Sequence, residues 1–242
     1  MKIALCLHGY FDSLQDPTSL GINGYNYIKK HILDKGDVDV FIHSWDKDRE
    51  DEISALYDPV KATFEYQKDF SETLKKLQIE KLKWQARSPA NVLSHFYSIQ
   101  EAFNLCYEDY PRKSYDFVIK SRFDLGQINR NTSGPGRGNP YPVQCINFNP
   151  RLYSGNLYMA NWGMMDQGPP DMWFYGNAWD MRYFNAIYDR VEEYLTWGSN
   201  YTKYYESLNG EVEISNSVRL YKWWMQEVGL WDKRVALDSE WE

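Results

Sequence analysis

The chain has 242 residues, which is long enough to bury one substantial hydrophobic core. Apolar residues make up 43% of it and charged residues 25%, which excludes an intrinsically disordered chain. The formal net charge of −7 argues against a nucleic-acid partner, so a phosphate-binding site must be local and built from a few basic side chains.

The first half of the sequence alternates between apolar runs and amphipathic segments. In chain order we predict a strand at 2–7, a helix at 19–34, a strand at 38–45, a polar loop at 46–51, a strand at 60–66, a charged helix at 71–83 and a helix at 88–110. The helix at 88–110 has the clearest pattern, because Val92, Phe96, Ile99 and Phe103 recur at intervals of four and three.

The second half is less regular. It begins with a strand at 115–124, and Gly, Pro and Asn then predict a long loop over 126–155 with a short strand near 143–148. A strand at 156–160 and helices at 177–195 and 213–228 complete the predicted elements.

This alternation predicts an α/β protein, a Rossmann-like three-layer α/β/α sandwich with a mostly parallel central sheet, in one domain over 1–242. Ligands of such sheets bind at the carboxyl ends of the strands. Polar residues follow three of the predicted strands, at His8 to Tyr10, His43 to Asp48, and Arg122 to Asp124. We therefore expect the site where these segments meet.

The strand that ends at Asp124 carries the strongest candidate motif. Residues two apart in a strand point to the same face, so Lys120, Arg122 and Asp124 project together. A carboxylate there can hold a divalent cation, and the ammonium and guanidinium groups can stabilise a leaving diphosphate. The alternative is an ordinary ion pair at the end of a strand.

Several segments resemble a known family in their order along the chain. They are Lys-Ile-Ala-Leu-Cys-Leu-His-Gly at 2–9, Asp-Val-Phe-Ile-His-Ser-Trp at 39–45, Asn-Val-Leu-Ser-His-Phe-Tyr-Ser-Ile at 91–99 and Tyr-Asp-Phe-Val-Ile-Lys-Ser-Arg-Phe-Asp at 115–124. Met-Asp-Gln at 165–167 and Trp-Phe-Tyr-Gly at 173–176 follow them. Over about residues 2–228 the chain is similar to glycosyltransferases of the GT-A type found in microbes and large viruses.

The resemblance implies a hexosyl- or deoxyhexosyltransferase that uses a nucleotide-sugar donor, Mn²⁺ or Mg²⁺, and a hydroxyl acceptor on a glycan or lipid-linked glycan. It assigns the nucleotide to residues 1–125 and the acceptor to 126–242. GT-A enzymes carry an Asp-x-Asp metal motif where this chain has Arg122-Phe123-Asp124, so only Asp124 carries over as a metal ligand.

The resemblance also suggests which residues contact the donor. The nucleoside would lie over Leu7, His8, Gly9 and Tyr10, with further contacts from His43, Trp45, Lys120 and Arg122. His43 and His95 can instead be ordinary packing histidines. A literal Asp-x-Asp at 46–48 is an alternative donor contact or a solvated loop.

An inverting transferase needs a general base for the acceptor hydroxyl. Asp166 is the first candidate, since an acidic residue stands there in the family; Asp171 is the second and Glu213 a distant third. The alternative for each is a helix cap or a loop hydrogen bond. Trp162 and Trp173 are either an acceptor platform or packing residues.

Two rival functions remain at this point. The aromatic content of 17% also fits a non-catalytic carbohydrate-binding module, because aromatic rings stack on sugars. A sulfotransferase or kinase is disfavoured, because neither GxxxxGK[ST] nor GxGxxG occurs. No run approaches the roughly 20 apolar residues that span a bilayer, and we expect a cytoplasmic location, in the host cytoplasm for a viral chain. The oligomeric state stays open.

Overall fold

The computed structural model describes residues 1–11, 20–81, 88–108, 114–126, 145–161, 165–208 and 216–238. The strands are β1 (Lys2–Gly9), β2 (Asp37–Ser44), β3 (Lys61–Phe64), β4 (Phe117–Arg122), β5 (Leu157–Ala160), β6 (Trp173–Gly176) and β7 (Arg234–Leu237). The helices are α1 (Leu20–His31), α2 (Glu50–Tyr57), α3 (Ser71–Leu77), α4 (Pro89–Tyr107), α5 (Ala178–Asn185), α6 (Tyr188–Leu195), α7 (Asn200–Ser207) and α8 (Ser217–Glu227). Short 3₁₀ turns lie at Leu33–Lys35, Lys47–Arg49, Ile79–Lys81 and Trp231–Lys233.

The seven strands of the described residues form one sheet in the order β3-β2-β1-β4-β6-β5-β7. β1 pairs in parallel with β2 and β4, and β2 pairs in parallel with β3. β6 runs antiparallel to both of its neighbours, and β7 is parallel to β5. Only β6 is therefore reversed, which confirms the α/β class and the mostly parallel sheet.

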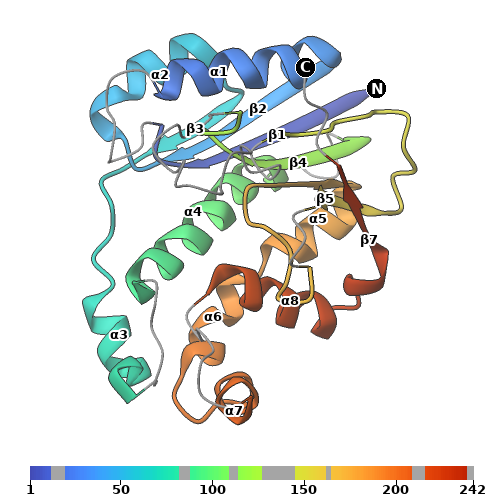
Figure 1. Ribbon diagram of the computed structural model, residues 1–242. Coiled ribbons are helices and arrows are strands. Elements are labelled where there is room, and N and C mark those ends of the chain that lie inside the picture. The colour runs from blue at the N-terminus through green and yellow to red at the C-terminus, as the bar shows by residue number, and fades with distance from the viewer. Residues whose placement is uncertain are drawn as a thin grey trace, which may run out of the picture.

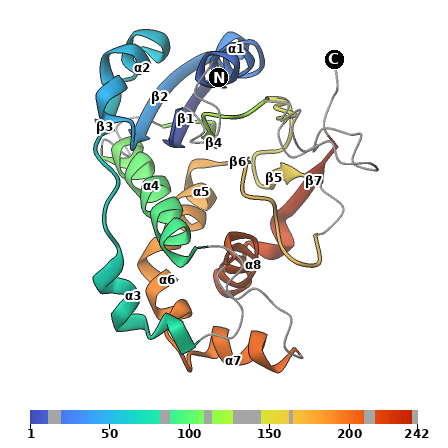
Figure 2. The same cartoon turned by 60° about the vertical axis from the view of Figure 1, so that its left-hand side comes forward.

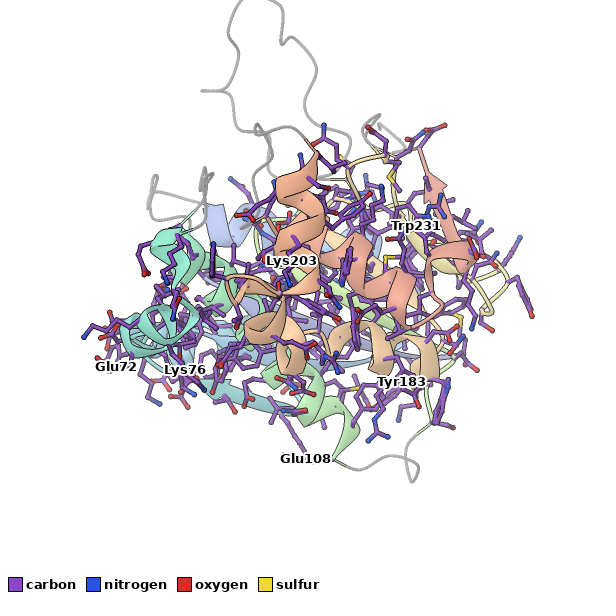
Figure 3. All side chains as sticks on the ribbon, turned by 90° about the horizontal axis from the view of Figure 1, so that it is seen from below. Glu72, Lys76, Glu108, Tyr183, Lys203 and Trp231 are labelled. Atoms are coloured by element: carbon purple, nitrogen blue, oxygen red, sulfur yellow. The ribbon has the colours of Figure 1, made fainter. Side chains whose placement is uncertain are left out.

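Helices cover both faces of the sheet. In Figure 1, α1 and α2 lie above it, while α4, α5, α6 and α8 lie below it; the turned view of Figure 2 agrees. Figure 3 looks at the lower helices from outside, with Tyr183 on α5 and Lys203 on α7 at their surface. Helices α3 and α7 lie farthest from the sheet, at the lower end of the molecule.

The alternation along β1 explains why there are two hydrophobic cores. Ile3, Leu5 and Leu7 pack with the residues of α1 and α2, whereas Ala4 and Cys6 pack with α4 and the helices beside it. A strand that is buried on both faces reads as a continuous apolar run, as predicted for 2–7. The three cysteines are buried and free.

Several predicted elements need correction. The helix expected at 177–195 is two helices that break at residues 186 and 187, and residues 145–148 form no strand. The strands β6 and β7 and the helices α2 and α7 were not predicted. The residues 127–144, 162–164 and 209–215 lie outside the described chain, and with them most of the long loop predicted at 126–155 and Glu213. No described helix has both the length and the apolar character required to cross a bilayer.

Candidate functional site

The connections of the sheet change direction between β1 and β4. From β1 the chain moves outward to β2 and β3, and it then crosses to the other side of β1 to form β4. Ligands of open α/β sheets bind beyond the carboxyl ends of the strands at such a point. Here His8 on β1 is the direct register partner of Arg122 on β4. The topology thus brings together two residues that the sequence analysis selected separately.

Lys120 and Arg122 face the α4 side of the sheet, opposite to Phe123. The Lys120 side chain is fully buried, with its ammonium 5.3 Å from the Phe174 ring centre. Arg122 donates to both oxygens of the Asp124 carboxylate, with Nε to Oδ1 at 2.8 Å. Lys120 and Arg122 therefore lie on one side, as the spacing of two predicted, whereas Asp124 lies in the turn after β4 and meets Arg122 from there.

The environment of Lys120 weakens its hold on a proton. Burial, together with the charge of Arg122, lowers its pKa to about 7, although the charges of Asp171 and Asp124 oppose this shift. Its ammonium donates to the backbone carbonyl of Asp171. Lys120 is thus a buried amine that gives up its proton more readily than an ordinary lysine, and a further anion nearby would favour its charged form.

Asp171 lies at the same edge of the sheet as Arg122 because β6 runs antiparallel to β4. It comes just before β6, and the residue after it accepts a hydrogen bond from the Arg122 amide at 3.3 Å. Its carboxylate accepts from the Ser217 hydroxyl at 2.7 Å, in the first turn of α8. Burial alone would raise its pKa. The positive groups of His95, Arg122 and Lys120, together with this hydrogen bond, instead hold the pKa well below its ordinary value. Before the reaction, Asp171 is therefore an ionised carboxylate beside Lys120 and Arg122.

Asp166, the first candidate base, lies elsewhere. Its side chain is exposed, and its backbone carbonyl accepts from Lys222, five residues further along α8 than Ser217. The structure therefore brings Asp171 to the cationic pair and leaves Asp166 at the surface.

The loop after β1 is held by α4. Gly9 has φ +95, a conformation that side chains rarely adopt, and an added Cβ would meet no atom within 4 Å. Its amide donates to the Ser98 hydroxyl at 2.9 Å. Tyr10 is half-buried and donates to Gln67, whereas Leu7 lies wholly in the core. Of the predicted nucleotide-binding residues here, Leu7 can therefore offer only its backbone.

The side chains of His43 and Trp45 make contacts with neighbouring residues of the protein. The two ring nitrogens of His43 lie 2.7 Å from the Ser98 hydroxyl and 3.0 Å from the Glu65 carboxylate. The Trp45 ring is 4% exposed and stacks on Tyr97 at 5.5 Å between ring centres. This arrangement is the packing alternative that was left open for His43. Both residues support the loop after β1, His43 through Ser98 and Trp45 through its amide, which donates to the Gly9 carbonyl at 3.3 Å. Their contact with the donor stays a prediction.

The described residues do not fit a divalent cation at Asp124. Such a cation takes several oxygen ligands, but both Asp124 oxygens already accept from Arg122, and Lys120 adds a second positive charge. Among the residues that the structure describes, no group of three His, Cys, Asp or Glu side chains can hold a metal. In the literal motif, Asp46 accepts from the Phe11 amide and Asp48 from the Tyr66 hydroxyl.

The sequence analysis missed the contribution of two helices. The α4 side chains His95 and Ser98 reach the site. Their helix was predicted from its apolar stripe, and the presence of two polar residues on such a buried helix is the signal that could have identified them. Ser217 and Tyr221 come from α8, and no local pattern placed α8 at the site. Trp173 is fully buried in the core on the face of the sheet that α1 and α2 cover, so it is not an acceptor platform; Trp162 lies outside the described residues.

Comparisons with known proteins find a likeness to solved structures. No protein-family model and no curated protein matches the sequence. Among solved structures, the chain is similar to mouse xyloside xylosyltransferase 1 in its apo form, with 11% identity and a TM-score of 0.43. The alignment covers 98% of this chain and 86% of that chain. The function is therefore argued from the residues of the site.

Proposed function

We propose that the protein is a glycosyltransferase that moves a sugar from a nucleotide-sugar donor to a hydroxyl of a glycan or a lipid-linked glycan. One observation carries the proposal. At the point where the sheet connections reverse, Lys120 and Arg122 lie beside the carboxylates of Asp124 and Asp171. A nucleotide-sugar presents an anionic diphosphate next to an electrophilic sugar carbon, and this cluster offers groups that complement both parts.

Lys120 and Arg122 act on the leaving group in this proposal. The bond between the anomeric carbon and the diphosphate oxygen breaks, and its electron pair stays on that oxygen. A buried ammonium and a guanidinium stabilise this developing charge without a metal ion, since positive groups act strongly where water is excluded. The positive charge of Lys120 is also better balanced once the diphosphate is bound.

Asp171 acts on the sugar side. The acceptor oxygen forms a bond to the anomeric carbon, and its proton passes to a carboxylate as that bond forms. We assign this carboxylate to Asp171, because it is ionised and its charge interacts with those of Arg122 and Lys120. Its negative charge also stabilises the positive charge that develops on the sugar ring. The donor lies mainly on residues 1–125 and the acceptor on 126–242, with Asp171 between them.

A thermal-shift screen tests the proposal. UDP, GDP, CMP, dTDP and their sugar conjugates are added with and without Mn²⁺ or Mg²⁺. Because a ligand of the native state raises the melting temperature by mass action, we expect one nucleotide family to stabilise the protein. The shift should be lost in Arg122→Met and kept in Arg190→Met, whose guanidinium pairs with Glu193 on the surface of α6.

Comparing the shifts with and without Mn²⁺ or Mg²⁺ tests which positive groups balance the charge of the diphosphate. A shift that needs no cation supports the assignment of Lys120 and Arg122, whereas strict dependence on Mn²⁺ supports the cation that the resemblance implies. The absence of any nucleotide effect, from a folded sample that binds simple glycans, would support the carbohydrate-binding module instead. That module remains the second candidate, because Trp179 and Tyr183 form an exposed aromatic pair on α5.

A further inference from the structure

Tyr221 on α8 has a buried hydroxyl beside the site. Its ring is fixed between Phe96 and Phe184, and the Phe184 ring stacks on it at 4.9 Å with an angle of 1°. Burial and the charge of Asp171 raise the pKa of this hydroxyl well above its ordinary value. Yet the hydroxyl has no hydrogen-bond partner among the described residues. Such an orphaned group is costly, and so it is expected to have a role.

His8 on β1 is a second buried polar side chain beside the site. The side chain is 2% exposed, and neither ring nitrogen has a hydrogen-bond partner in the part of the chain that the structure describes. Burial and the positive charges around it, chiefly that of Lys120, lower its pKa well below the ordinary value, so the ring is neutral. The His95 ring lies between the two residues, 5.1 Å from His8 and 6.4 Å from Tyr221 between ring centres.

We propose that Tyr221 and His8 hydrogen-bond hydroxyl groups of the transferred sugar and so help to determine which sugar the enzyme accepts. The inference rests on the proposed glycosyltransferase function. Both residues flank Lys120, whose ammonium lies 5.9 Å from the Tyr221 ring centre, so they are next to the place assigned to the diphosphate. The sugar is joined directly to that diphosphate.

The chemistry of the two groups favours a hydroxyl over a phosphate as their partner. A neutral imidazole has one donor and one acceptor, and a phenol can also do both. Sugar hydroxyls likewise donate and accept. A phosphate only accepts, and its charge is already complemented by Lys120 and Arg122. The neutral pair is thus matched to the uncharged part of the donor.

The test compares Tyr221→Phe with the wild type by calorimetric titration. The probes are UDP against UDP-glucose and UDP-galactose, and GDP against GDP-mannose and GDP-fucose, all without an acceptor. We expect the variant to bind the nucleotide-sugar about five- to tenfold more weakly, as for one lost hydrogen bond, with the affinity for the free diphosphate within about twofold. Its melting temperature should not fall, because the deleted hydroxyl had no partner.

Tyr57→Phe is the matched control. Its hydroxyl is also buried without a described partner, but it lies on α2, under the opposite face of the sheet. We expect it to bind both probes as the wild type does. His8→Leu provides a second variant, which should also lose sugar affinity and keep diphosphate affinity.

The outcomes separate the inference from the function. If the wild type binds no nucleotide, the proposed function fails. If Tyr221→Phe and His8→Leu bind the nucleotide-sugar normally, the function stands and the inference is overturned. A lower melting temperature with unchanged binding would assign Tyr221 to the fold alone, and a loss of turnover with normal donor binding would place the pair on the acceptor.

Discussion

At the scale of single residues, the surroundings of a carboxylate decide what it can do. Asp166 and Asp171 stand five positions apart in one aromatic, Gly- and Pro-rich segment, and the sequence offers no physical reason to prefer either. In the structure the Asp171 carboxylate accepts from Ser217 and its backbone carbonyl accepts from the Lys120 ammonium, whereas the side chain of Asp166 faces solvent. The reaction assigned to this site therefore depends on Asp171.

This assignment predicts different kinetics for two isosteric variants. Asp171→Asn should lower kcat/KM by about 10²- to 10⁴-fold, the usual contribution of a positioned acid or base, whereas Asp166→Asn should stay within about twofold of the wild type. The measurement is the rate at which the stabilising nucleotide-sugar is consumed. The reverse pattern would restore Asp166 as the base.

At the scale of elements, the parts predicted correctly were those with a clear period or a continuous apolar run. β1, β2, β4 and α4 were recognised in this way. β6 was missed because Trp173–Gly176 is buried on both faces and only four residues long, so it has no alternation to detect. Its reversed direction, which brings Asp171 to the site, depends on pairing with strands distant in sequence. The sequence therefore offered candidate residues at the ends of β1 and β4 and at Asp171, but it gave no sign of the direction of β6 or of the contact between Asp171 and α8.

The segment 165–170 gives a test of how one element positions another. Gly168 has φ +139, and an added Cβ would lie 2.1 Å from the Val218 carbonyl oxygen in α8. Gly168→Ala should push this segment off α8 and lower the free energy of unfolding by about 2–4 kcal/mol. Catalytic turnover should fall as well, because Asp171 would lose its position beside Ser217.

Gly198→Ala is the control for Gly168→Ala. Gly198 also has a positive φ, +82, but an added Cβ there would meet no atom within 4 Å. The control should therefore cost only the backbone strain, about 1 kcal/mol in denaturant unfolding, and leave turnover unchanged. Equal losses of stability in the two variants would mean that the contact with Val218 is unimportant.

At the scale of the whole molecule, the buried polar groups of the site lower the stability of the fold. The chain is acidic, with a formal net charge of −7, but the switch point of its sheet contains a buried lysine, an arginine and the neutral His8. Polar groups buried without a full set of partners reduce the free energy of folding. Such a cluster is expected where binding a ligand requires it. The unliganded protein should therefore be less stable than a variant with an apolar side chain in this place.

The pH dependence of the stability of Lys120→Met tests whether the buried lysine destabilises the unliganded protein. The folded-state pKa of about 7 lies below the ordinary lysine value of 10.5, so between these values the unfolded chain binds the proton that the folded chain has lost. Wild-type stability should thus rise with pH above about 7, and the burial cost of the charged ammonium is fully present below it. From about pH 6 to pH 9, the stability of Lys120→Met relative to the wild type should fall by about 2–3 kcal/mol in urea unfolding. Lys76→Met, at an exposed position on α3 (Figure 3), should show no such trend. A constant difference for Lys120→Met would mean that Lys120 stays charged in the fold, and the site would then hold a permanent cation before any donor binds.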